Sequence, residues 1–260
     1  MSRSIPHSRG PFHADQVRPG DPYELSNGHP VRCSPAGGRH SGANADGASV
    51  IGSDPDVESV GVDAGFSPEP GTLRAPDVAV GVSSEPGWSP GAPPLALEYA
   101  DRGQDEDDLA DKIHDLLEAG TRWIWVVRLD GPRRVEVHTP DGVRLVHPGD
   151  ELTAPGVLRN PVPVEALFNR KAAERVTFRN LLQRQGYDDL DAVRTEGRQL
   201  GAREGELKTL RSTLLEACEA KGFALTDDQM ELVRSCEDPD RLKAWFRHAI
   251  RVASVDEVFD

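Results

Sequence analysis

The sequence is poor in features that would place the protein in a membrane or in an oxidising compartment. Only three cysteines occur among the 260 residues, at positions 33, 218 and 236, and no two of them form a C-x-x-C pair. Scattered cysteines predict reduced thiols rather than disulfides or a zinc site. No apolar run is long enough to cross a bilayer, and the beginning of the chain, MSRSIPHSRGPFH, lacks the apolar core of a signal peptide. We therefore expect a cytoplasmic protein that does not interact with membranes.

Positive charge is also scarce. The chain has 30 Lys and Arg against 44 Asp and Glu, a net charge of −14. Residues 1–165 hold 26 acids and 14 bases, and residues 166–260 hold 18 acids and 16 bases, so most of the excess lies in the first part. Affinity for duplex DNA comes mainly from neutralising phosphates, so this composition argues against nonspecific nucleic-acid binding. DNA binding would require a local basic surface, for which the candidates are Arg32, Arg39, Arg74, Arg122, Arg133 and Arg134.

Two short apolar runs, DVAVGV (77–82) and PLALEYA (94–100), are joined by a loop rich in Gly, Pro and Ser. If they pair as a hairpin about residue 88, Asp77 at the entry of the first lies beside Glu98 near the exit of the second. Side-chain alternation then gives the hairpin one apolar face and one face on which both acids stand among small residues. Two carboxylates without a cation nearby in the sequence suit a hard divalent metal such as Mg²⁺.

A helix is predicted directly after these strands, over DEDDLADKIHDLLEAG (105–120). Asp105 is a suitable N-cap, and Gly120 a suitable stop. Its apolar stripe places Lys112 at the border of the buried face, from where the ammonium could extend over the sheet towards the two acids.

Each of these residues also has a structural interpretation. Asp77 follows a proline at a strand entry, where aspartate is common in turns, and Glu98 could pair with an arginine and perform no chemistry. Asp108 lies four residues before Lys112, in the favoured orientation for an ion pair on the helix surface.

Taken in order, these sequence segments resemble those of the PD-(D/E)XK nuclease superfamily, and within it the Uma-two family of restriction endonucleases. The resemblance covers about residues 19–168 and includes YELSNGHPV (23–31), SPAGGRH (34–40), VDAGF (62–66), APDVAV, LALEYA and WIWVV (123–127). It implies hydrolysis of DNA with Mg²⁺ or Mn²⁺, with Asp77 and Glu98 as metal ligands and Lys112, displaced from the strand to the helix, assisting the attack of water. Glu24 and His40 match positions that the family tends to keep, which implies accessory roles.

The predicted fold class is α/β: a restriction-endonuclease-like core with a mixed central sheet flanked by helices, followed by an all-helical extension. We expect a mobile N-terminal arm at 1–18, the nuclease domain at 19–168 and the extension at 169–260. Within the domain, the family fold requires a helix over the Gly-rich segment 37–56, and single strands are expected over 57–66 and 72–82. One helix is predicted from about 164 to 186, and the expected role of the extension is formation of a homodimer or the docking of a partner.

Three functions are compatible with these patterns. The first is a metal-dependent endonuclease that acts on DNA. The second is a catalytically inactive nuclease-fold module for binding or regulation, which is favoured by the acidic composition and by Ala100, which occupies the place of the usual strand lysine. The third is a structural scaffold that assembles through its helical tail.

Overall fold

A computed structural model describes residues 10–103 and 105–259. The chain forms two compact units, one up to Asp188 and one from Asp189 onwards. Among the described residues, no helix is both long enough and apolar enough to cross a membrane. The unit that ends at Asp188 contains the sheet and all the residues singled out above as candidate site residues.

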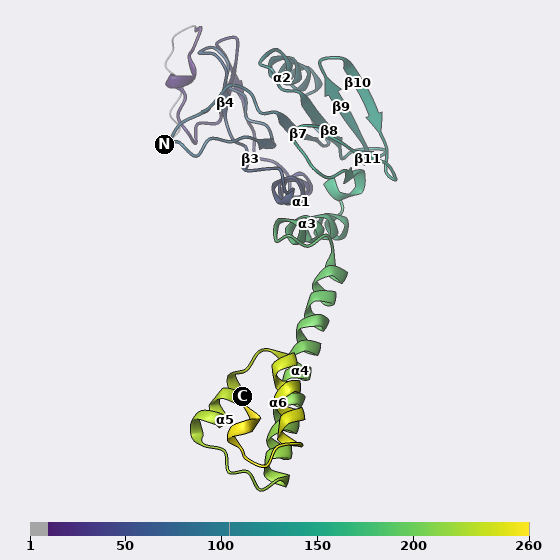
Figure 1. Cartoon of the computed structure of the whole chain (residues 1–260). Helices are drawn as coiled ribbons and strands as arrows, with labels where there is room; N and C mark the ends of the chain where they lie inside the picture. The colour runs from purple at the N-terminus through teal and green to yellow at the C-terminus, as the bar shows by residue number, and fades with distance from the viewer. Residues whose placement is uncertain (1–9, 104, 260) are drawn as a thin grey trace. The chain divides into compact units, whose positions relative to one another are not determined.

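The first unit is built around a mixed six-stranded sheet in the order β10-β9-β8-β7-β5-β3 (Figure 1). Strands β7 and β8 run parallel, and all the other neighbouring pairs are antiparallel. The α/β class with a mixed central sheet is therefore confirmed. The strands are β3 (Val60–Val62), β5 (Val78–Val80), β7 (Leu95–Ala100), β8 (Trp123–Arg128), β9 (Arg134–Thr139) and β10 (Gly142–Val146).

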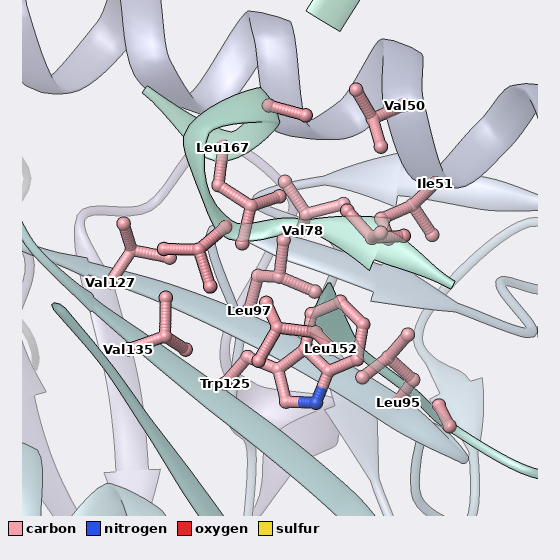
Figure 2. Packing of buried hydrophobic residues seen from close by; sticks show 14 of the residues in the cluster. Val50, Ile51, Val78, Leu95, Leu97, Trp125, Val127, Val135, Leu152 and Leu167 are labelled. Carbon is pink, nitrogen blue, oxygen red and sulfur yellow. The ribbon is translucent and has the colours of Figure 1, made fainter. Parts of the chain in front are cut away.

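Helices cover both faces of the sheet, and the alternation of β7 assigns its side chains to them. Leu95, Leu97 and Tyr99 belong to a large apolar cluster that includes residues of α1 (Gly38–Ser53) and α3 (Arg170–Arg184). Figure 2 shows part of this cluster, with Val50 and Ile51 of α1 above the strand residues. The opposite face of β7 contributes to a smaller cluster whose other members, from α2 (Glu106–Glu118) and β8, are Leu109, Ile113, Leu116, Ile124 and Val126.

Helix α1 forms in the Gly-rich segment, as predicted from the resemblance. Its small residues allow a close approach to the sheet, because a Cβ atom at Gly47 would overlap the hydroxyl group of Tyr99. On the other side of the sheet, Asp105 caps α2 by accepting hydrogen bonds from Asp107 N and Asp108 N, as the sequence indicated. Helix α2 is therefore fixed by a cap visible in the sequence, whereas α1 was expected only from the family resemblance.

Two of the predicted strands are wrong in extent. The segment 57–66 is divided into β3 and β4 (Phe66–Ser67), because Asp63 adopts a positive φ of 50° that an extended strand does not allow. In the segment 72–82, only β5 is a strand of the sheet, and Gly81 turns the chain with a φ of 82°. The short strands outside the central sheet are β1 (Tyr23–Ser26), β2 (His29–Arg32), β6 (Ser89–Pro90), β11 (Glu151–Leu152) and β12 (Val162–Pro163).

The single helix expected at 164–186 is also wrong. The structure has a short 3-10 helix, η2 (Val164–Leu167), followed by α3, because the Asn169 side chain accepts a hydrogen bond from Ala172 N and starts a new helix there. Helix α3 belongs to the first unit and packs on α1, where Asn180 donates hydrogen bonds to Val50 O and Ser53 Oγ. The functional boundary between 168 and 169 stays a prediction.

Residues 1–9 of the predicted mobile arm lie outside the described residues. In the described part, η1 (Ala14–Gln16) and its flanks pack against the β1 hairpin, and Phe12, Ala14 and Val17 are buried with Leu25 and Leu73. The Trp88 indole N–H donates a hydrogen bond to Ala14 O.

The second unit has its own apolar core. It consists of α4 (Leu190–Ala220), α5 (Asp227–Ser235), α6 (Pro239–Ala249) and η3 (Asp256–Val258). Leu214, Val233, Leu242 and Trp245 are buried in its centre. Thr226 begins α5 with a capping box completed by Gln229.

Candidate active site

The two carboxylates lie on adjoining strands at the α2 side of the sheet. Val78 pairs with Leu97 and Ala79 with Ala96, and continuing this register by one step sets Asp77 opposite Glu98. Asp77 stands directly before β5, and Glu98 is in the middle of β7. The antiparallel pairing is the one deduced from their equal distance to the connecting loop.

Glu98 is buried, with only 8% of its side chain exposed, and its only cationic contact among the described residues is Lys112. The ammonium nitrogen lies 3.0 Å from Oε1 and 3.3 Å from Oε2. The contact with Oε1 lacks the angle of a hydrogen bond, so this oxygen remains a buried acceptor without a donor. Burial raises the pKa of Glu98 to about 8; Lys112 opposes this rise, while Asp77 and Glu24 add to it.

Lys112 points over the sheet from α2, and its contacts are directed inward rather than to Asp108. Its ammonium group donates to Ala75 O at 2.7 Å and lies 3.1 Å from Glu24 Oε1, in addition to its contact with Glu98. Burial by itself lowers the pKa of Lys112, but the nearby carboxylates of Glu24, Glu98 and Asp77 outweigh burial and raise it above its usual value. The side chain is therefore an ammonium ion at neutral pH.

Asp77 is held by two donors. Tyr99 N donates to Oδ2 at 2.6 Å, and His40 Nε2 lies 3.1 Å from Oδ1. The hydrogen bond to Asp77 raises the pKa of His40, which favours the imidazolium form. His40 reaches the site from the first turn of α1, 37 residues before Asp77.

The site contains three further residues, Arg74, Asp115 and Asp63, which the sequence interpretation did not assign to it. Arg74, expected as part of a DNA-facing surface, is buried with 2% of its side chain exposed and pairs with Glu24 and Asp115, so that expectation is wrong. Asp63 lies near Asp77, and burial, followed by the Asp77 charge, raises its pKa. The one signal available in the sequence was VDAGF, where an aspartate before Ala-Gly is compatible with the positive φ that the structure shows.

Comparison with known proteins gives the family. A model of Uma2, described as a putative restriction endonuclease, matches residues 12–162, which is more than half of the chain. The chain belongs to the Uma2 family. No curated protein matches the sequence significantly.

The fold has a counterpart among solved structures. The crystal structure of a putative nuclease of the DUF820 group from Anabaena variabilis superposes with a TM-score of 0.53 at 18% sequence identity. The match covers 61% of this chain and 98% of the other. At this identity the similarity concerns the fold alone, and it confirms a nuclease-like α/β architecture.

Nucleases of this kind generally use a divalent metal, and the Uma2 site can be tested for its fit to one. Among the described residues, no three His, Cys, Asp or Glu side chains are grouped as a ready-made metal site. Mg²⁺, however, is commonly held by one or two carboxylates together with water and substrate phosphate. The donor set of Asp77 and Glu98 satisfies that requirement, and Glu98 Oε1 is a buried oxygen that accepts no hydrogen bond, although the Lys112 ammonium lies 3.0 Å from it.

The charge balance of the site points in the same direction. Among the described residues of the site, three cations (Arg74, Lys112 and His40) face five acids (Glu24, Asp115, Glu98, Asp77 and Asp63). The raised pKa of Glu98 and of Asp63 reflects this shortage of positive charge as well as burial. The residues present therefore fit a divalent cation.

Proposed function

We propose that this protein is a metal-dependent endonuclease that hydrolyses DNA phosphodiester bonds, in which Asp77 and Glu98 hold Mg²⁺ or Mn²⁺ and Lys112 assists the attack of water. One observation carries the proposal: the Lys112 ammonium lies against Glu98, which is aligned with Asp77 on the adjoining strand. Membership of the Uma2 family supports the reaction class.

The bound metal would supply a polarised phosphoryl oxygen and a more acidic water molecule. The residues of the chain would stabilise charge and hold the reacting groups in position. Lys112 is an ammonium ion with a raised pKa, so it acts as a hydrogen-bond donor and a positive charge beside the scissile phosphate, not as a general base. Glu24 and Ala75 O hold the ammonium in place. His40 and Tyr99 N orient Asp77, which gives His40 an accessory role.

DNA as the substrate must be reconciled with the net charge of −14. An acidic surface repels phosphates, so binding without metal should be weak. A divalent cation at Asp77 and Glu98 removes part of this repulsion at the point where the phosphate must approach. Arg39, with 49% of its side chain exposed, lies next to His40 in sequence, and a phosphate would have to compete with Asp101 for its guanidinium.

A second candidate function is a nuclease-fold binding module without catalysis. It is favoured by the state of Asp77, both of whose oxygens are already engaged by His40 and Tyr99 N. In this function the carboxylates, His40 and Lys112 form a closed polar network that stabilises the fold and leaves no place for a metal.

Cleavage of supercoiled plasmid with Mg²⁺ or Mn²⁺ separates the two candidates. For the nuclease we expect metal-dependent nicking that falls by about 10²-fold or more in Asp77→Asn, Glu98→Gln and Lys112→Met, the scale of a lost proton-transfer or charge-stabilising group. Asp111→Asn and Lys171→Met are matched controls, because both residues are exposed and neither contacts the site. Absence of nicking by the wild type, or nicking that persists in all three site variants, would exclude the nuclease.

We also propose that the second unit mediates a homodimer. Its long helix α4 leaves Leu190 and Leu200 exposed, by 39% and 57%, in the half that lies outside the apolar core.

A further inference from the structure

A chain of buried charges extends from Lys112 away from the two proposed metal ligands. Lys112 Nζ lies 3.1 Å from Glu24 Oε1, and the other oxygen of Glu24 lies 3.3 Å from Arg74 Nη1. On its far side, Arg74 contacts Asp115 Oδ2 through Nε at 2.8 Å and Nη2 at 2.7 Å. At most 14% of any of these four side chains is exposed.

Two contacts connect helix α2 with the segment that leads into Asp77. Asp115 and Lys112 lie one helical turn apart on α2. Arg74 and Ala75 are consecutive residues just before Asp77; Arg74 binds Asp115, and Ala75 O accepts a hydrogen bond from Lys112. The segment that carries the first carboxylate is thereby tied to the helix that carries the ammonium group.

Apolar packing alone does not fix this geometry. Helix α2 also contacts the sheet through Leu109, Ile113 and Leu116, but such contacts are non-directional and constrain which face is buried more than the exact position of the helix. The planar guanidinium of Arg74 presents donors in fixed directions and can engage two carboxylates at once. A buried ion-pair network is also costly to desolvate, so apolar residues would be a simpler source of stability.

We infer that Arg74 is a positioning residue: by holding Asp115 and Glu24 together, it fixes the Lys112 ammonium relative to Asp77 and Glu98. The inference rests on the proposed nuclease function. Arg74 touches neither proposed metal ligand, and it acts through Glu24 and through the placement of α2. Its guanidinium also neutralises Glu24 and Asp115 together with Lys112.

Three variants separate positioning from stability. Arg74→Lys keeps the positive charge, but an ammonium lacks the planar guanidinium that contacts both carboxylates. For this variant we expect nearly the wild-type melting temperature, a kcat lowered at least tenfold and an unchanged KM. Arg74→Met leaves Asp115 buried without a cationic partner and Glu24 with Lys112 alone, so it should lower both melting temperature and kcat. The double variant Arg74→Met/Asp115→Leu removes the pair without leaving Asp115 charged, so melting temperature should recover in part while kcat stays low.

Arg128→Met is the matched control. Arg128 also links the sheet to α2, through Glu106 at 2.7 Å, but it contacts none of the site residues. We expect its kcat to equal that of the wild type. Wild-type kcat in Arg74→Lys, or kcat that returns together with melting temperature in the double variant, would overturn the positioning role.

A second readout does not depend on activity. The Lys112 ammonium is buried among three acceptors, so its protons should exchange slowly and give an NMR resonance that is identified by its loss in Lys112→Met. We expect this resonance in the wild type and in Arg128→Met, and its loss or displacement in Arg74→Lys. Absence from the wild type, or persistence unchanged in Arg74→Lys, refutes the inference. A wild type that shows the expected resonances but cleaves no DNA refutes the proposed function instead.

Discussion

Binding of Mg²⁺ at the site is expected to release a proton from Glu98. Burial raises the pKa of this carboxyl to about 8, so about nine-tenths of it is protonated at pH 7 in the metal-free protein. A carboxyl must lose its proton to bind a metal, and metal binding is therefore linked to proton release. From the same pKa, release should amount to about 0.9 proton per metal at pH 7 and about 0.2 at pH 8.5.

The number of protons follows from calorimetric titration of the protein with Mg²⁺ in buffers that differ in their heat of ionisation. Glu98→Gln has no proton to lose at this position and should show neither the release nor comparable affinity. His40 faces Asp77 and has a raised pKa, so the titration is repeated with His40→Gln, in which the contribution of Glu98 remains. Of the other charged groups, Lys112 stays protonated across this range because its pKa is also raised. Glu24 and Asp63 are present in the wild type and in both variants.

Proton release that stays constant between the two pH values would refute this reasoning, because a group with a pKa of about 8 must change its protonation between them. Equal release by the wild type and Glu98→Gln would assign the proton to another group. Either result would remove Glu98 as the buried ligand that gives up a proton.

Three further predictions concern stability and assembly. The metal-free protein should lose stability as pH rises from about 4.5 to about 8, by at most about 1.4 kcal/mol per pH unit, because the folded state keeps the Glu98 proton that the unfolded chain releases; urea titrations should show a smaller slope in Glu98→Gln. Gly47→Ala should destabilise the fold by about 1–3 kcal/mol through overlap with Tyr99, whereas Gly42→Ala, in the same helix but with free space around it, should stabilise it by about 0.5–1 kcal/mol; an equal change in melting temperature for both would contradict the packing of α1. Deletion of residues 189–260 should convert a dimer into a monomer in light scattering, and an unchanged number of chains per particle would remove the dimer proposal.

The sequence was sufficient for the features that depend on local periodicity. The alternation of the two apolar runs gave the faces of β5 and β7, and the equal distances of Asp77 and Glu98 from the loop gave their register. The apolar stripe of α2 placed Lys112 beside the buried face, where the structure has it. In each case the neighbouring residues are close in the chain, so the repeat of a strand or helix is enough to orient them.

The partners of each charged side chain were decided only by the tertiary structure. Lys112 could pair with Asp108 on its own helix or with Glu98 across the sheet, and the outcome depends on which way α2 rests on the strands. Arg74 turns inward, and its partners Asp115 and Glu24 lie 41 and 50 residues away in the chain. The positive φ of Asp63 likewise interrupts a strand that the sequence pattern had predicted to be continuous.

The sequence by itself therefore determined the α/β class, the pairing of the segments that carry Asp77 and Glu98, and the placement of Lys112 beside the buried face of its helix. The tertiary structure decided that Lys112 meets Glu98, that His40 meets Asp77 and that Arg74 is part of the buried network instead of a DNA-facing surface. The physical reason is that periodicity encodes the direction of a side chain within its own element, whereas the pairing of charges between elements depends on how helices and strands pack in three dimensions.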